Sequence, residues 1–210
     1  FKGLGSYFDK IQRMRKLSSL ISDDFLISKD KIEIASSICK VDLMSDLVGE
    51  FPELQGIVGG HFAKFQGFDK DISLAIREHY LPVGIASRTP QKPFSIALAL
   101  TDKIDTLVGF FGIDHKPTSS KDPYALRRSA LGVIRILLEN NKEFKIKDLI
   151  NNKKRLEKYN EPVINLQKNN KGYRNQFAPI KFLENELDYG KSINALIVDA
   201  DDDFGYAIRV

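Results

Sequence analysis

The clearest structural signal in the chain is Lys121-Asp122-Pro123-Tyr124-Ala125-Leu126-Arg127-Arg128-Ser129-Ala130-Leu131-Gly132-Val133-Ile134-Arg135-Ile136. Asp122 is a residue type that accepts hydrogen bonds from the free amides of a first helical turn. Pro123 suits the first helical position, because its φ is fixed and its missing N–H leaves nothing unpaired there. We therefore predict a helix that begins at Pro123. Apolar residues then recur at helical spacing and predict one buried face: Leu126, Ala130, Val133, Ile134, Leu137 and Leu138.

Five further segments have the apolar spacing of helices, at residues 6–21, 31–48, 54–66, 70–79 and 94–111. The clearest is the last, in which steps of three and four residues connect Ala97, Leu100, Ile104, Leu107, Val108 and Phe111. The second segment has a similar apolar face, formed by Ile34, Ile38, Val41 and Val48. No run between turn residues alternates polar and apolar side chains for long enough to indicate a strand. The sequence predicts an all-α helical bundle.

The composition is that of an ordinary soluble globular protein. The chain has 210 residues, of which 42% are hydrophobic, enough for one or two domains with a real core. Its net charge of +4 suits a polyanionic partner without requiring one. The single cysteine, Cys39, excludes an internal disulfide and is expected in the core. No apolar run is long enough to span a membrane.

The chain divides near residue 150. Polar runs such as Asn151-Asn152-Lys153-Lys154 and Lys168-Asn169-Asn170-Lys171 follow that point and are typical of exposed or disordered segments. We predict a helical domain at residues 1–150 and a poorly defined extension at residues 151–210, helical or partly disordered. The acidic run at residues 199–203 lacks the glycine and terminal glutamate of a calcium loop, so a solvated turn is the preferred interpretation. Before the boundary, long connections are expected at residues 82–93 and 112–123, and the second leads into the arginine-bearing helix.

Four motifs occur in order between residues 49 and 136. They are Gly49-Glu50-Phe51-Pro52-Glu53-Leu54-Gln55-Gly56, Glu78-His79-Tyr80-Leu81-Pro82, Asp102-Lys103-Ile104-Asp105-Thr106-Leu107-Val108-Gly109 and the run at residues 121–136. Together they resemble the beta subunit of bacterial glycyl-tRNA synthetase. Members of that family are several times longer, so the chain is expected to be an internal fragment of a cytoplasmic protein. The first residues, Phe1-Lys2-Gly3, lack an initiator methionine and a signal-peptide pattern, which agrees with this expectation.

The resemblance also implies a domain related to the HD phosphohydrolases, in a degenerate form. The candidate metal ligands would be His61, His79 and Asp102. An active site of that class needs a His-Asp pair, whereas this chain has His79-Tyr80, and a tyrosine is not an anionic ligand at neutral pH. We therefore expect no metal and no catalytic residue in the chain. For His61 the preferred interpretation is a half-buried place on a helix, with one ring nitrogen bonded to the backbone.

Four basic residues are the candidate RNA contacts: Lys121, Arg127, Arg128 and Arg135. Taken alone, they fit an ordinary helix surface on which long side chains pair with acids and cover apolar groups. The resemblance favours contact with RNA, whose phosphates are bound by Arg and Lys. A second basic group near the N-terminus, at Lys10, Arg13, Arg15 and Lys16, is expected to be a solvated helix face.

The resemblance implies that the chain contributes to the ATP-dependent joining of glycine to tRNA(Gly). The adenylate-forming centre belongs to the alpha subunit in that family, so this part is expected to bind or position tRNA and to support assembly. No cofactor is expected on the chain itself, while the complete enzyme uses ATP and Mg²⁺. The expected partners are tRNA(Gly), the alpha subunit and, as a further candidate, a second beta subunit, with no membrane. The alternatives are a metal-dependent HD-type phosphohydrolase and a helical scaffold that contacts no RNA.

Overall fold

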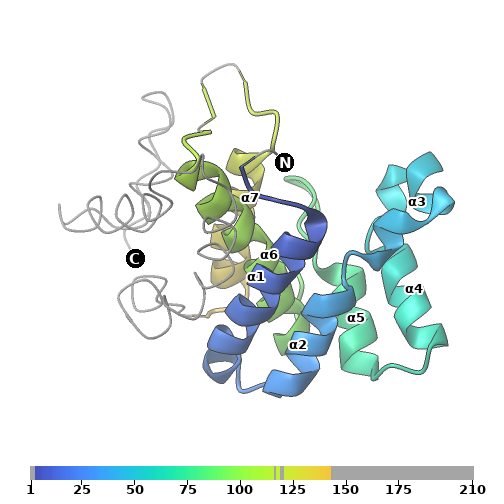
Figure 1. The fold of residues 1–210 in the computed structure, drawn as a ribbon. Coiled ribbons are helices and arrows are strands. Elements are labelled where there is room, and N and C mark those ends of the chain that lie inside the picture. The colour runs from blue at the N-terminus through green and yellow to red at the C-terminus, as the bar shows by residue number, and fades with distance from the viewer. Residues whose placement is uncertain (1–2, 116, 119–120, 143–210) are drawn as a thin grey trace, which may run out of the picture.

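The computed structural model describes residues 3–115, 117–118 and 121–142, and these residues form a helical bundle (Figure 1). The α-helices are α1 (Tyr7–Ile21), α2 (Lys29–Ile38), α3 (Asp46–Glu50), α4 (Ile57–Phe65), α5 (Lys70–Glu78), α6 (Pro93–Gly112) and α7 (Leu126–Glu139). Short 3-10 helices lie at Asp23–Phe25, Val41–Met44 and Pro52–Leu54. The described part of the chain contains no strand, only an isolated bridge between Thr118 and Lys121. The predicted all-α class is confirmed.

Helix α6 is the centre of the bundle, and α1, α2, α5 and α7 all pack against it. Ala97, Leu98 and Leu100 have no exposed surface, so this helix is buried on every side over its first half. The predicted stripe of α6 is confirmed, because Ile104 is also buried and Leu107 packs against the same core. Cys39 lies in this core as a free thiol with no exposed surface, as predicted. No helix among the described residues is long and apolar enough to cross a bilayer.

The predicted start of α7 is wrong by three residues. The helix begins at Leu126, and Ala125 before it has a left-handed φ of 54°. Asp122 does cap the helix, but from further away: its carboxylate accepts hydrogen bonds from the amides of Leu126 at 2.8 Å and Arg127 at 2.9 Å. Pro123 therefore lies in the turn that precedes the helix. The apolar face follows the prediction except at its end, where Leu138 is half exposed.

The single helix predicted at residues 31–48 is also wrong. Helix α2 ends at Ile38, and the chain turns through a 3-10 helix before α3 begins at Asp46. The cause is Asp42, which is fully buried and accepts hydrogen bonds from the amides of Gly56 at 2.7 Å and Gly59 at 3.2 Å. This contact with the start of α4 holds the chain in a turn. As a result Val41, expected on a buried face, is 47% exposed.

Helices α3 and α4 project from the bundle, and α5 joins them to it (Figure 1). The joint between α4 and α5 is tight because two glycines face α5. A Cβ atom on Gly60 would lie 2.7 Å from the Cβ of Arg77 and 2.9 Å from the carbonyl oxygen of Ser73. Residues 143–210, which include the predicted extension and the end of the predicted first domain, lie outside the described residues. The division near residue 150 stays a prediction.

We predict that Gly60→Ala destabilises the chain by about 1–3 kcal/mol, because α4 must move away from α5 to admit the new methyl group. Gly49→Ala is the matched control, since a Cβ there meets nothing within 4 Å. The control is expected to leave stability unchanged or to raise it by up to about 1 kcal/mol through helix propensity. Urea denaturation followed by circular dichroism measures both. Equal midpoints for the two variants would contradict the tight joint.

Candidate functional site

The centre of the bundle holds a buried polar cluster built around Lys40, which follows the end of α2. Its ammonium lies 2.9 Å from Nε2 of His79 and 2.9 Å from Oδ2 of Asp102. It also lies 3.9 Å from the centre of the Tyr80 ring, in the geometry of a cation–π contact. The structure thus brings together two of the residues that the resemblance names as metal ligands. A lysine side chain, which the sequence did not single out, lies between them.

The hydrogen bonds around His79 fix its state. Nδ1 lies 2.6 Å from the carbonyl oxygen of Ile76, which can only accept, so Nδ1 carries the proton. Nε2 is then free to accept a hydrogen bond from Lys40. Burial, followed by the positive charge of Lys40, lowers the pKa of His79 to about 3. The imidazole is therefore neutral at physiological pH.

Two carboxylates balance the buried cations. Burial acts to raise the pKa of Asp102, but the charges of Lys10 and Lys40 outweigh it and hold this pKa well below the usual value. Lys10 lies 2.9 Å from Oδ1 of Asp102 and 3.2 Å from Oδ2 of Asp105. Arg13 donates from Nε to Oδ1 of Asp105 at 2.8 Å. The expectation of a solvated basic face near the N-terminus is therefore wrong for Lys10 and Arg13, which face inward from α1.

His61 does not join this cluster. It is exposed on α4, so the expectation of a half-buried imidazole is wrong, and the three residues named by the resemblance do not converge on one point. Within residues 3–115, 117–118 and 121–142, no three His, Cys, Asp or Glu side chains are grouped so that they could hold a metal ion. Tyr80 remains a neutral phenol, because burial raises its pKa. The cluster is chemically an ion-pair network: its positive charge is supplied by lysine and arginine.

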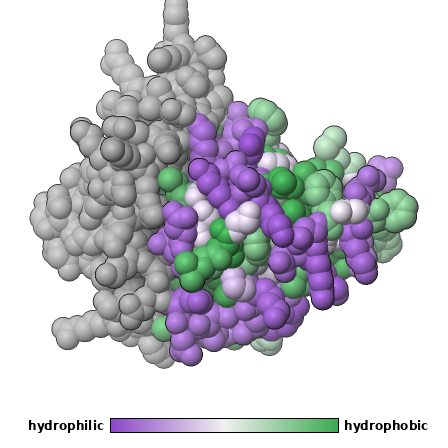
Figure 2. All heavy atoms as spheres, turned by 90° about the horizontal axis from the view of Figure 1, so that it is seen from below, coloured by the Kyte–Doolittle hydropathy of each residue, from purple (hydrophilic) through white to green (hydrophobic). Residues whose placement is uncertain are grey.

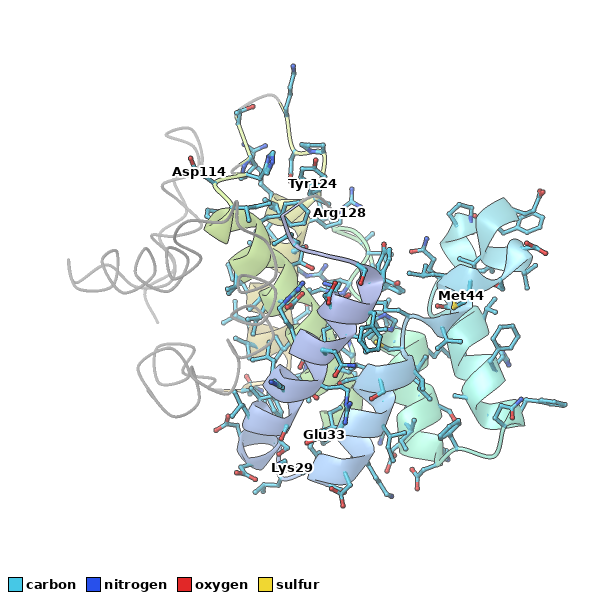
Figure 3. All side chains as sticks on the ribbon, in the orientation of Figure 1. Lys29, Glu33, Met44, Asp114, Tyr124 and Arg128 are labelled. Carbon is cyan, nitrogen blue, oxygen red and sulfur yellow. The ribbon has the colours of Figure 1, made fainter. Side chains whose placement is uncertain are left out.

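The four predicted RNA contacts lie along α7 and the segment before it. Lys121 and Arg128 are exposed, and Arg128 makes no hydrogen bond or ion pair with the rest of the described chain (Figure 3). Arg127 is partly buried and donates to the carbonyl oxygen of Thr118 at 2.5 Å. Three of the four residues thus flank the start of α7. Their role in RNA binding stays a prediction.

Arg135 lies two turns further along α7 and is held by the loop between α5 and α6. Its guanidinium donates to the carbonyl oxygens of Gly84 and Ile85, each at 3.0 Å, and to that of Ser87 at 2.9 Å. It also pairs with Glu139 at 2.9 Å. This side chain therefore holds the middle of the loop, and Arg88 holds its end through an ion pair with Glu78 at 2.7 Å. The tip of the loop exposes Ile85 to 93%.

The chain is similar to proteins of one known family. Residues 1–189 match the family described as the glycyl-tRNA synthetase beta subunit. The chain belongs to this family. It is 48% identical over 140 residues to the glycine–tRNA ligase beta subunit of Rhodospirillum centenum, a match that covers 65% of this chain and 20% of that protein.

Two other relatives agree with this membership. The glycine–tRNA ligase beta subunit of Paracoccus denitrificans is 51% identical over 137 residues, covering 65% of this chain and 20% of the relative. The beta subunit of Pseudomonas savastanoi is 45% identical over 147 residues, covering 70% of this chain and 22% of the relative. The chain therefore spans about a fifth of the length of these glycyl-tRNA synthetase beta subunits.

We predict that the chain loses stability as the pH falls from about 6.5 to about 3, the range between the unfolded and folded pKa values of His79. In this range the unfolded chain takes up a proton that the folded chain excludes. One pKa unit is worth about 1.4 kcal/mol, so the loss is on the order of a few kcal/mol. Asp102 and Asp105 add to it below about pH 4, because their lowered pKa values favour the folded state only while they are ionised.

The measurement is the free energy of unfolding in urea at a series of pH values. His79→Gln should flatten the dependence between pH 6.5 and 4, whatever its effect on stability at pH 7. His61→Gln is the control, because that imidazole is exposed. The same slope in the His79→Gln variant and the unaltered chain would show that His79 takes up its proton in the folded state.

We predict that Arg135→Ala frees the loop at residues 83–88 without unfolding the bundle. A hydrogen bond to a charged donor contributes roughly 1.5–3 kcal/mol, so amide exchange in this loop should rise by about tenfold or more. Hydrogen–deuterium exchange on a peptide covering the loop measures it. Arg128→Ala is the matched control on the same helix and should change nothing there. If the loop exchanges equally slowly in both variants, it keeps its path without Arg135.

Proposed function

We propose that this chain is the part of a glycyl-tRNA synthetase beta subunit that binds and positions tRNA(Gly) and supports assembly with the alpha subunit. Family membership over residues 1–189 supports the coarse assignment. The observation that carries the tRNA contact is Arg128, an exposed guanidinium with no protein partner among the described residues. Exposed Lys121 adds a second positive charge to the chain before the same helix. Such side chains suit the phosphates of a folded RNA.

The four basic residues are given different roles in this proposal. Arg128, Lys121 and Arg127 contact phosphate, with Arg127 also bound to the segment before α7. Arg135 contributes through the loop that it holds, because its donors already meet three carbonyl oxygens and Glu139. A guanidinium has five N–H donors in a fixed plane, so few remain for a phosphate. Arg135 is therefore a positioning residue.

The rest of the function follows from the same proposal. The complete enzyme joins glycine to tRNA with ATP and Mg²⁺ in the cytoplasm, and the adenylation centre lies in the alpha subunit. This chain binds neither cofactor and is not catalytic alone. A second beta subunit is a candidate partner in the assembly. The helical bundle is a degenerate relative of the HD domain.

The phosphohydrolase alternative is disfavoured by Lys40. A metal bound by His79 and Asp102 would have to displace an ammonium that both residues contact at 2.9 Å. The metal would also lack an anionic ligand from the residue after His79, because that residue is Tyr80, whose phenol is neutral. Two ligands on a crowded site do not make a hydrolytic metal centre.

The test is a titration of the complete alpha–beta enzyme with tRNA(Gly) at several salt concentrations. The triple variant Lys121→Ala, Arg127→Ala and Arg128→Ala should bind more weakly and with a smaller salt dependence. Removal of one phosphate contact reduces the steepness of log K against log salt by roughly 0.7–0.9. Lys29→Ala is the control, an exposed lysine at the far end of the bundle in the view of Figure 3. An unchanged affinity and slope in the triple variant would favour the scaffold that contacts no RNA.

A further inference from the structure

The loop between α5 and α6 ends in a closed turn that exposes one aliphatic side chain. The amide of Ser87 donates to the carbonyl oxygen of Gly84 at 3.1 Å, and the hydroxyl of Ser87 accepts from the amide of Val83 at 3.2 Å. Ile85 lies inside this turn and is 93% exposed. A single exposed apolar residue on a surface needs no special explanation. An exposed apolar residue at the tip of a firmly held turn does need one.

Contacts with α5 and α7 hold the turn in place. The Arg135 guanidinium donates to three carbonyl oxygens of the turn. Arg88 pairs with Glu78 at 2.7 Å, and the hydroxyl of Thr89 donates to Glu139 at 2.8 Å. The side chain at the tip therefore has a defined position, although it is almost entirely exposed.

The surroundings of the tip carry a net positive charge. Residues 81–93 contain no Asp or Glu, and they include Arg88 and Lys92. Glu78 and Glu139, which contact the loop, are each paired with an arginine. An anionic partner can therefore approach the tip without meeting an unpaired carboxylate of the loop.

The loop begins beside the helix that carries the proposed phosphate contacts. A Cβ atom on Gly132 of α7 would lie 3.7 Å from Cδ of Pro82. Arg128 is exposed one turn before Gly132, and Arg135 follows Gly132 by three residues, so the three residues share one side of α7. Arg128 and Arg135 are then roughly 10 Å apart along the helix axis. The apolar tip and an exposed guanidinium thus lie on neighbouring parts of one surface.

Other exposed apolar sites of the chain have acidic surroundings. Leu26, between α1 and α2, is 94% exposed and follows the exposed residues Asp23 and Asp24. Figure 2 shows green apolar atoms at the right-hand end of the molecule, where Figure 1 places α3 and α4. Asp46 and Glu50 are exposed there on α3. Carboxylates beside an apolar side chain repel phosphates, so the loop tip suits RNA better than either of these sites.

We propose that Ile85 stacks on the open end of an RNA helix, against the flat face of its terminal base pair, while Arg128 contacts a phosphate of the same stem. Such a face is apolar and has phosphates around its rim, so it is complementary to an apolar tip with cations beside it. Isoleucine is among the side chains that proteins press against base steps. In tRNA, the helix end that no loop closes is that of the acceptor stem. This inference rests on the proposed function and names the part of tRNA that this surface binds.

The experiment compares two RNAs as ligands of the complete alpha–beta enzyme. One is tRNA(Gly), and the other is the same RNA with its acceptor stem closed by a four-nucleotide loop and its chain opened in the anticodon loop. Ile85→Ala truncates the tip. Leu26→Ala is the matched control, because its side chain is equally exposed but lies beside carboxylates. Fluorescence anisotropy at several salt concentrations measures each affinity, and circular dichroism checks that both variants fold.

We expect Ile85→Ala to weaken the binding of tRNA(Gly) by roughly three- to tenfold, because an aliphatic side chain loses its contact with an apolar face. The affinity for the closed RNA should not change. The steepness of log K against log salt should also stay the same, because the substitution removes no charge. Leu26→Ala should alter neither affinity.

An unchanged affinity of Ile85→Ala for tRNA(Gly), or an equal loss with both RNAs, would overturn the inference. If the triple variant Lys121→Ala, Arg127→Ala and Arg128→Ala still binds tRNA weakly in that case, only the assignment of Ile85 is lost. If the triple variant is also without effect, the tRNA contact itself is wrong. Weaker association of the alpha and beta subunits in Ile85→Ala, with unchanged tRNA affinity, would show that the tip contacts protein and would overturn the inference too.

Discussion

The fold depends on the ammonium of Lys40, which joins the end of α2 to His79 after α5 and to Asp102 in the middle of α6. Taking a charge out of water is costly, and the cost is offset only when every charged group finds a partner. Here Lys10 and Arg13 extend the same network from α1 through Asp105. Four helices are therefore tied together at the centre of an otherwise apolar bundle, three of them through ion pairs and α5 through the hydrogen bond from Lys40 to neutral His79. Removing one member would leave the others buried without compensation.

Much of the bundle could be predicted from the sequence, because its helices have regular apolar spacing. The stripe of α6 and the buried face of α7 follow directly from that periodicity. The break between α2 and α3 could not be predicted in this way. It depends on Asp42 binding amides 14 and 17 residues further along the chain, a contact that no local pattern encodes.

Only some residues of the buried polar cluster could be predicted from the sequence. Resemblance named His79 and Asp102, and the structure brings them together. The resemblance gave no role to Lys40, and the basic residues of α1 were expected on a solvated surface. Lysine side chains are normally exposed. The burial of Lys40 and Lys10 becomes evident only when Asp102, 62 and 92 residues further along the chain, is placed beside them. The signal that could have indicated it is the position of Lys40 directly after buried Cys39 within an apolar segment.

Arg135 holds its loop through main-chain oxygens alone, and this has an evolutionary consequence. A peptide carbonyl is present at every position, so the residues at positions 84 and 85 can be exchanged while the bonds from Arg135 to the loop carbonyls persist. The backbone path of the loop then depends on Arg135 and not on which side chains the loop exposes. A related protein that keeps the arginine can therefore carry different residues at the exposed end of this loop. A sequence difference there does not imply a different backbone path.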